Sequence, residues 1–127
     1  MRPTSKVETL IDRVSKMLDE KQSTLSDDSP DWVRHVTLDI TYEKNSSSDV
    51  RRYHDEATAF RDSKPEEERE SVVVSDVFNQ ERLREMFCTP GTDALEHELQ
   101  ANGYKTELRP YSCAYGLIGC DLRITWE

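Results

Sequence analysis

Two short segments of this chain are nearly identical, and both alternate apolar and polar side chains. Residues 38–43 read LDITYE and residues 122–127 read LRITWE, so leucine, isoleucine, threonine and glutamate recur in register. A period of two residues is typical of a strand with one buried face. The sequence therefore predicts two amphipathic strands that share one sheet and need a covering layer. Their match is out of phase with the order of the other elements, which favours convergence over internal duplication.

The composition limits the size of the core and the kind of partner. The chain of 127 residues is long enough for one domain, but only 35% of it is hydrophobic and 34% is charged. This balance predicts a thin two-layer core and at least one solvated segment. The net charge of −9 argues against nonspecific binding to nucleic acid, which needs clusters of basic residues. It is compatible with a partner protein that has a basic surface.

We expect a soluble, cytoplasmic protein, because the sequence has no recognisable targeting signal and its cysteines suit a reducing compartment. No apolar run is long enough to cross a bilayer, and the N-terminus leads into a charged amphipathic helix, unlike a secretory signal. Three cysteines is an odd number. Cys113 and Cys120 should point to opposite faces of a predicted hairpin, so we expect all three thiols to be reduced.

The first predicted helix begins at a capping box and ends near Lys21. Ser5 and Glu8 have the spacing with which side chains satisfy the first free amides of a helix. Residues 22–31, rich in serine and aspartate, are predicted to be a linker. The apolar side chains that recur at helical spacing are Val7, Leu10, Ile11, Val14 and Leu18.

A second helical region is predicted between residues 83 and 103. Thr89 and Pro90 indicate a cap followed by proline at the first helical position, where its missing N–H costs nothing. Asn102 and Gly103 indicate that the helix ends there, with a residue in the left-handed backbone conformation. The apolar positions of this region are Leu83, Met86, Phe87, Leu95 and Leu99.

Four strands complete the predicted α+β fold, at residues 32–43, 71–74, 104–112 and 119–127. The element order α-β-β-α-β-β favours a two-layer sandwich in which two helices cover one face of a four-stranded, mainly antiparallel sheet. We expect residues 1–127 to form a single domain. In the first strand the side chains predicted to face the core are Val36, Leu38, Ile40 and Tyr42, and those predicted to face away are Thr37, Asp39, Thr41 and Glu43.

A long polar insertion interrupts this pattern at about residues 44–70. It opens with three serines and closes with Pro65 and a run of glutamates. Insertions of this kind are usually either disordered or functional, and disorder is the first expectation here. The middle, residues 50–60, has two aromatic and two alanine side chains and is compatible with a short helix.

No standard catalytic or cofactor-binding pattern is present in the sequence. His35, His54 and His97 are each predicted to be surface residues, because none belongs to a recognisable acid–base set. The three cysteines lack the close pairs typical of zinc sites, and four scattered glycines do not form a phosphate-binding loop. We therefore expect no enzyme activity, no cofactor and no metal.

The remaining hypothesis is a non-catalytic protein–protein interaction module, acting as an accessory, inhibitory or assembly subunit. It would bind through the exposed sheet face, through an edge strand, for which the C-terminal strand ending at Trp126 and Glu127 is the candidate, or through the 44–70 insertion. Arginine and aromatic side chains on these surfaces favour protein contacts. One alternative is a small-ligand-binding domain or small enzyme with a pocket between helices and sheet, and another is an acidic nucleic-acid mimic that blocks a basic groove. Self-association into a homo-oligomer also stays open. The predicted partner-binding residues are Asp39, Arg109, Tyr111, Arg123 and Trp126 of the strands and Arg51, Arg52 and Tyr53 of the insertion.

Overall fold

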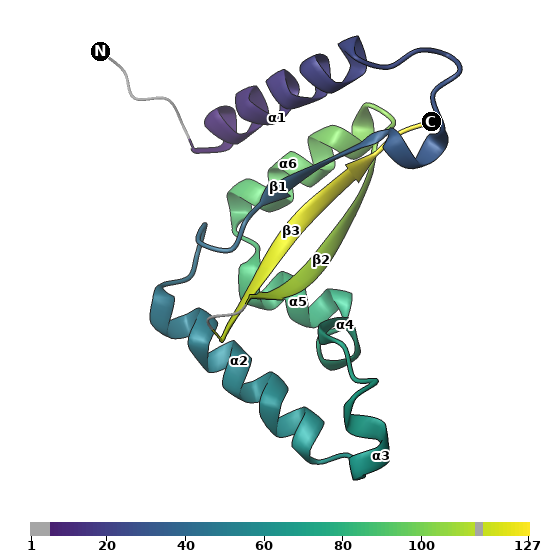
Figure 1. Ribbon diagram of the computed structural model, residues 1–127. Helices are drawn as coiled ribbons and strands as arrows, with labels where there is room; N and C mark the ends of the chain where they lie inside the picture. The colour runs from purple at the N-terminus through teal and green to yellow at the C-terminus, as the bar shows by residue number, and fades with distance from the viewer. Residues whose placement is uncertain (1–5, 114–115) are drawn as a thin grey trace. The chain divides into compact units, whose positions relative to one another are not determined.

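The computed structural model describes residues 6–113 and 116–127 of the chain (Figure 1). Three antiparallel strands form one sheet in the order β1-β3-β2, so that β3 lies in the middle. The expected free edge at the C-terminal strand is therefore wrong, because β3 has a neighbour on each side. The elements are α1 (Lys6–Ser23), the 3-10 helix η1 (Asp31–Val33), β1 (His35–Asp39), α2 (Ser47–Asp62), α3 (Glu66–Arg69), α4 (Val74–Val77), α5 (Gln80–Phe87), α6 (Pro90–Ala101), β2 (Lys105–Cys113) and β3 (Leu117–Thr125). Among the described helices, none combines the length and the apolar character that crossing a bilayer needs.

Contacts divide the described chain into two compact units, and each strand has residues in both. Unit 1 comprises the described parts of Met1–Leu38, Thr89–Glu107 and Leu122–Glu127. Unit 2 comprises Asp39–Cys88 and the described parts of Leu108–Asp121.

The predicted four-stranded sheet with two covering helices is wrong, because the described chain has three strands and six α-helices. The missing strand is residues 71–74, whose β-branched side chains indicated a strand. The chain instead turns there and enters α4, and the N–H of Val73 donates to the Asp76 carboxylate at 3.0 Å. This bond satisfies a free amide at the helix start, and residues 71–74 pair with none of the three strands of the sheet.

The first predicted strand is also too long, since β1 covers only five of its residues. The Thr41 N–H donates to Asp39 Oδ1 at 2.9 Å, a turn that aspartate forms readily and that ends the strand. Ile40 is still buried, and beyond it the alternation of buried and exposed side chains stops. Tyr42, predicted to face the core, is 58% exposed, and Thr41, predicted to face away, is buried.

The expectation that the two similar segments share one sheet is confirmed. β1 and β3 are neighbours in the sheet, and Leu38 and Ile40 are buried, as are Leu122 and Ile124. Leu38, Leu122 and Ile124 belong to unit 1 and Ile40 belongs to unit 2, so the first segment contributes to both cores.

The predicted first helix is confirmed as α1, which packs against α6 in unit 1. Leu10, Val14 and Leu18 of the apolar stripe are buried. The predicted capping box begins at Ser5, which lies outside the described residues.

The predicted helix restart at Thr89 and the predicted helix end at Gly103 are both confirmed in α6. The Thr89 hydroxyl accepts from the Thr92 N–H at 3.2 Å, and Pro90 occupies the first helical position. At the other end Gly103 has a φ angle of 89°, the left-handed conformation that follows many helices.

The segment at 44–70 contains α2, which is held to α5 by buried polar and aromatic contacts of unit 2. Asn45 is buried and donates to the Met86 carbonyl at 2.8 Å. Its side-chain oxygen accepts from the Tyr53 hydroxyl at 3.0 Å. The Tyr53 ring meets Phe87 edge to face, with centroids 5.5 Å apart. These contacts pack α2 against the core of unit 2, together with the buried Val50.

Candidate functional site

The Tyr111 side chain of β2 lies over Gly119 of β3, in a cluster of polar side chains in unit 2 that also contains Asp39 and Thr41. A Cβ added to Gly119 of β3 would lie 2.3 Å from Cζ of Tyr111 on β2. The same Cβ would lie 2.7 Å from the Thr41 hydroxyl. Only glycine leaves room for both side chains at this point of the sheet.

A chain of hydrogen bonds joins the three strands at this position. The Cys120 N–H donates to Thr41 Oγ1 at 3.0 Å. The Tyr111 hydroxyl donates to Asp39 Oδ2 at 2.7 Å, because an ionised carboxylate can only accept. The Thr41 hydroxyl must then donate to Tyr111 Oη, 3.0 Å away. The donor and the acceptor of each of these three hydrogen bonds are thereby fixed.

Burial and these hydrogen bonds shift the pKa values of the neighbouring acidic groups in opposite directions. Burial alone would raise the pKa of Asp39, but hydrogen bonds from Thr41 and Tyr111 outweigh it and hold the pKa below the ordinary value. Burial raises the pKa of Tyr111 to about 12, and the neighbouring Asp39 carboxylate adds to that shift. Burial also raises the pKa of Asp121, with the charge of Asp39 as a second cause.

These pKa shifts favour a structural role for Asp39 and Tyr111 over a role as general acid or base. A general acid or base works best when its pKa lies near the working pH. Asp39 is instead held ionised and Tyr111 protonated far from neutrality. The cluster therefore joins the strands of unit 2 through polar contacts that stay intact around neutral pH.

The sheet residues predicted to bind a partner fall into both units. Asp39 and Tyr111 meet in unit 2, and Arg109 is exposed in the same unit. Arg123 and Trp126 belong to unit 1, where the Trp126 ring packs edge to face on that of Tyr104. The predicted set is therefore not one group within either unit, and its binding role stays a prediction.

The predicted residues of the insertion differ in exposure. Arg51 and Arg52 are exposed on α2, where Arg52 pairs with Asp49 at 3.2 Å. Tyr53 is only 7% exposed and packs in the core of unit 2. In this structure Tyr53 contributes to the packing of α2, while the two arginines stay accessible.

One edge of the sheet is closed by a side chain that sequence reasoning missed. The Gln80 amide of α5 donates to the Leu108 carbonyl at 2.6 Å and accepts from the Leu108 N–H at 3.1 Å. Pro110, two residues along the same strand, has no N–H to offer. Gln80 thus substitutes for a neighbouring strand along part of β2, in unit 2. Proline inside a predicted strand was the available signal for an edge.

The other edge, along β1, has no such closure among the described residues. The Trp126 N–H donates to the Arg34 carbonyl at 3.3 Å, so the even-numbered residues of this antiparallel ladder face β3. The main-chain groups of His35, Thr37 and Asp39 then point to the opposite side, where no described strand pairs with them.

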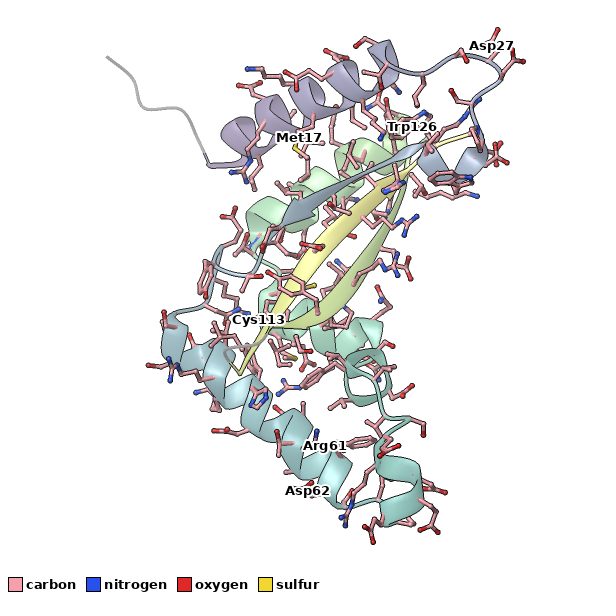
Figure 2. All side chains as sticks on the ribbon, in the orientation of Figure 1. Met17, Asp27, Arg61, Asp62, Cys113 and Trp126 are labelled. Atoms are coloured by element: carbon pink, nitrogen blue, oxygen red, sulfur yellow. The ribbon has the colours of Figure 1, made fainter. Side chains whose placement is uncertain are left out.

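A shallow, widely open groove of about 560 Å³ lies beside this open edge in unit 1. One wall belongs to α1 and the other to β1. Met17, labelled in Figure 2, supplies apolar surface on the α1 side. The lining residues are Met17, Glu20, Lys21 and Thr24 of α1 and His35, Val36 and Thr37 of β1.

Comparison of the chain with protein-family models, with curated protein sequences and with solved structures finds no significant match.

Proposed function

We propose that this protein is a protein–protein interaction module that binds an extended segment of a partner protein along the open edge of β1. The observation that carries the proposal is the difference between the two edges of the sheet. Gln80 and Pro110 close part of the β2 edge, whereas β1 presents free main-chain groups beside a groove. An extended segment that joins such an edge gains affinity from main-chain hydrogen bonds and specificity from pockets for alternate side chains.

The composition of β1 supports this role. Natural proteins shield open edges with proline, lysine or bulges, because a free edge pairs with other chains. The strand His35–Asp39 contains neither proline nor lysine. Its central residue, Thr37, is exposed, and the groove beside it offers both the apolar Met17 and the charged Lys21. A bound segment would thus find apolar and polar contacts on alternate side chains.

A peptide library displayed on phage tests this proposal, because it presents many extended sequences at once and requires no identified partner. Thr37→Pro removes the central N–H of the open edge, and the matched Thr37→Ala removes only the side chain. Peptides selected on the wild-type protein should bind Thr37→Ala and lose at least tenfold in affinity for Thr37→Pro. Bound peptide should also slow amide exchange at His35 and Thr37, because these amides become hydrogen-bonded.

Proline is tolerated on edge strands whose N–H faces solvent, so Thr37→Pro should keep the wild-type circular dichroism and melting behaviour. Two results would contradict the proposal. Selected peptides could bind Thr37→Pro as tightly as the wild type, which would place the binding surface elsewhere. Alternatively, no peptide could be enriched over an unrelated protein of equal charge.

A pocket of about 140 Å³ in unit 2 favours small-ligand binding as a second candidate function. This volume is close to that of an apolar cavity known to hold one benzene molecule, about 150 Å³. His54 and Arg61 lie among otherwise mostly apolar lining residues, so a small apolar carboxylate would suit it. NMR titration with isovalerate should shift Val72–Val77 resonances, and Ala57→Trp should abolish the shifts by filling the pocket. Equal shifts in Ala57→Trp would refute this assignment.

A further inference from the structure

The five residues of β1 are complementary to themselves when two copies pair antiparallel, edge to edge. The free main-chain groups belong to the odd-numbered residues, so mutual hydrogen bonding joins odd positions to odd positions. In the register centred on Thr37, each Thr37 lies opposite the other. His35 of each copy then lies opposite Asp39 of the other copy.

Each cross-strand pair in this register is favourable. Pairs of threonines and pairs of opposite charges stabilise neighbouring antiparallel strands. Asp39 is ionised at neutral pH, because hydrogen bonds hold its pKa low. His35 Nδ1 lies 2.8 Å from the Trp32 carbonyl, which can only accept, so Nδ1 donates to it. A bond to the facing Asp39 carboxylate would require a second N–H, on Nε2. On the other face Val36 would meet Leu38.

We propose that the partner on the β1 edge is a second copy of this chain, in an isologous dimer whose two sheets join through paired β1 strands. The inference rests on the proposed function, because it uses the same edge and the same groove. A two-fold axis perpendicular to the sheet, near Thr37, keeps the same face of both strands on the same side. Val36 and Leu38 of the second copy therefore face the groove beside Met17 of the first.

The expected dimer is weak and reversible. The pairing contributes one five-residue strand from each copy. Stable interfaces involve about 20–30 residues of each partner, far more than one strand of five residues. We therefore expect an equilibrium between monomer and dimer that shifts with protein concentration.

Disulfide trapping tests the register. In a Cys113→Ser background, Thr37→Cys should form a disulfide-linked dimer under mild oxidation, because opposed residues of a hydrogen-bonded pair have Cα atoms about 5.5 Å apart. His35→Cys in the same background is the matched control, since its two cysteines would lie about 13 Å apart along the strands. Glu107→Cys, on the partly closed β2 strand, is a second control. Only Thr37→Cys should be trapped.

Sedimentation velocity tests the chemistry of the contact. The wild type and Thr37→Ala should dimerise with rising concentration, whereas Thr37→Pro and His35→Asp should remain monomeric. His35→Asp places two carboxylates opposite each other in both halves of the dimer, and His35→Gln is its uncharged control. Equal dimerisation of His35→Asp and wild type would overturn the inference, as would equal trapping of Thr37→Cys and His35→Cys.

The two proposals can fail separately. If the wild type stays monomeric while selected peptides bind Thr37→Ala and not Thr37→Pro, the edge binds other proteins and the self-pairing is wrong. If there is neither self-association nor peptide binding at this edge, both proposals fail.

Discussion

Replacing Gly119 by alanine inserts one methyl group into the space that the Tyr111 ring occupies. The new Cβ would lie 2.3 Å from Cζ and 2.5 Å from Oη of Tyr111, and 2.7 Å from Oγ1 of Thr41. Such short contacts force the ring to move. Because Asp39 holds the ring through its hydroxyl at 2.7 Å, movement of the ring breaks that bond.

The expected loss of stability follows from the contacts that the ring would give up. A hydrogen bond to a charged acceptor such as Asp39 contributes about 1.5–3 kcal/mol, and one between neutral hydroxyls about 0.5–1.5 kcal/mol. Overpacking by one methyl group costs about 1–3 kcal/mol, partly relieved when the ring moves away. We expect Gly119→Ala to lower the free energy of unfolding by about 3 kcal/mol.

Urea unfolding monitored by circular dichroism measures this loss, and a double-mutant cycle assigns it to the ring. In a Tyr111→Ala background the aromatic ring is absent and only the 2.7 Å contact of the new Cβ with Thr41 Oγ1 remains, so Gly119→Ala should cost less than it does in the wild type. Tyr111→Phe keeps the ring and removes both hydroxyl contacts, so it separates the bonds from the steric clash. Equal m-values among the variants would show that the change lies in stability.

Two results would refute the proposed packing: a very small stability loss in Gly119→Ala, or a loss that does not depend on the Tyr111 ring. A loss below about 0.5 kcal/mol for Gly119→Ala is within the range of neutral surface substitutions and is incompatible with the observed contacts. A full loss that persists in the Tyr111→Ala background would mean that the glycine is required for another reason.

Three further predictions concern titration, edge closure and thiol reactivity. The pKa of Tyr111 is raised to about 12 from an ordinary value of 10.0, so the resulting stability is present below pH 10 and lost as the pH rises toward 12. Unfolding at several pH values should show a steeper alkaline loss for the wild type than for Tyr111→Phe, and equal slopes would contradict this. Gln80→Ala should speed amide exchange at Leu108 and cost about 1–2 kcal/mol, because both main-chain groups lose their partner. An unchanged exchange rate would refute the edge closure. A thiol reagent should label the half-buried Cys113 in the native state but Cys120 only on unfolding, because Cys120 is buried and its pKa is raised to about 12. Rapid native labelling of Cys120 would contradict its burial.

Local patterns predicted those elements whose stability depends on neighbouring residues. The stripe through Leu10, Val14 and Leu18 predicted α1, and Thr89 and Gly103 predicted the two ends of α6. The physical reason is that helix spacing and capping act within a few residues of the chain. The sequence predicted the Asp39–Tyr111 cluster only in part: the alternation of side chains placed both residues on one face of the predicted sheet.

Distant contacts decided what local patterns misjudged. Residues 71–74 have the composition of a strand, yet a strand also needs a neighbour, and these residues pair with none of the three strands. The same holds for the strand edges, since Gln80 closes Leu108 from 28 positions away in the sequence. By itself the sequence determined which faces are apolar and where helices begin and end. Tertiary structure alone decided the number of strands and which edge stays open, because pairing depends on residues far apart in the chain.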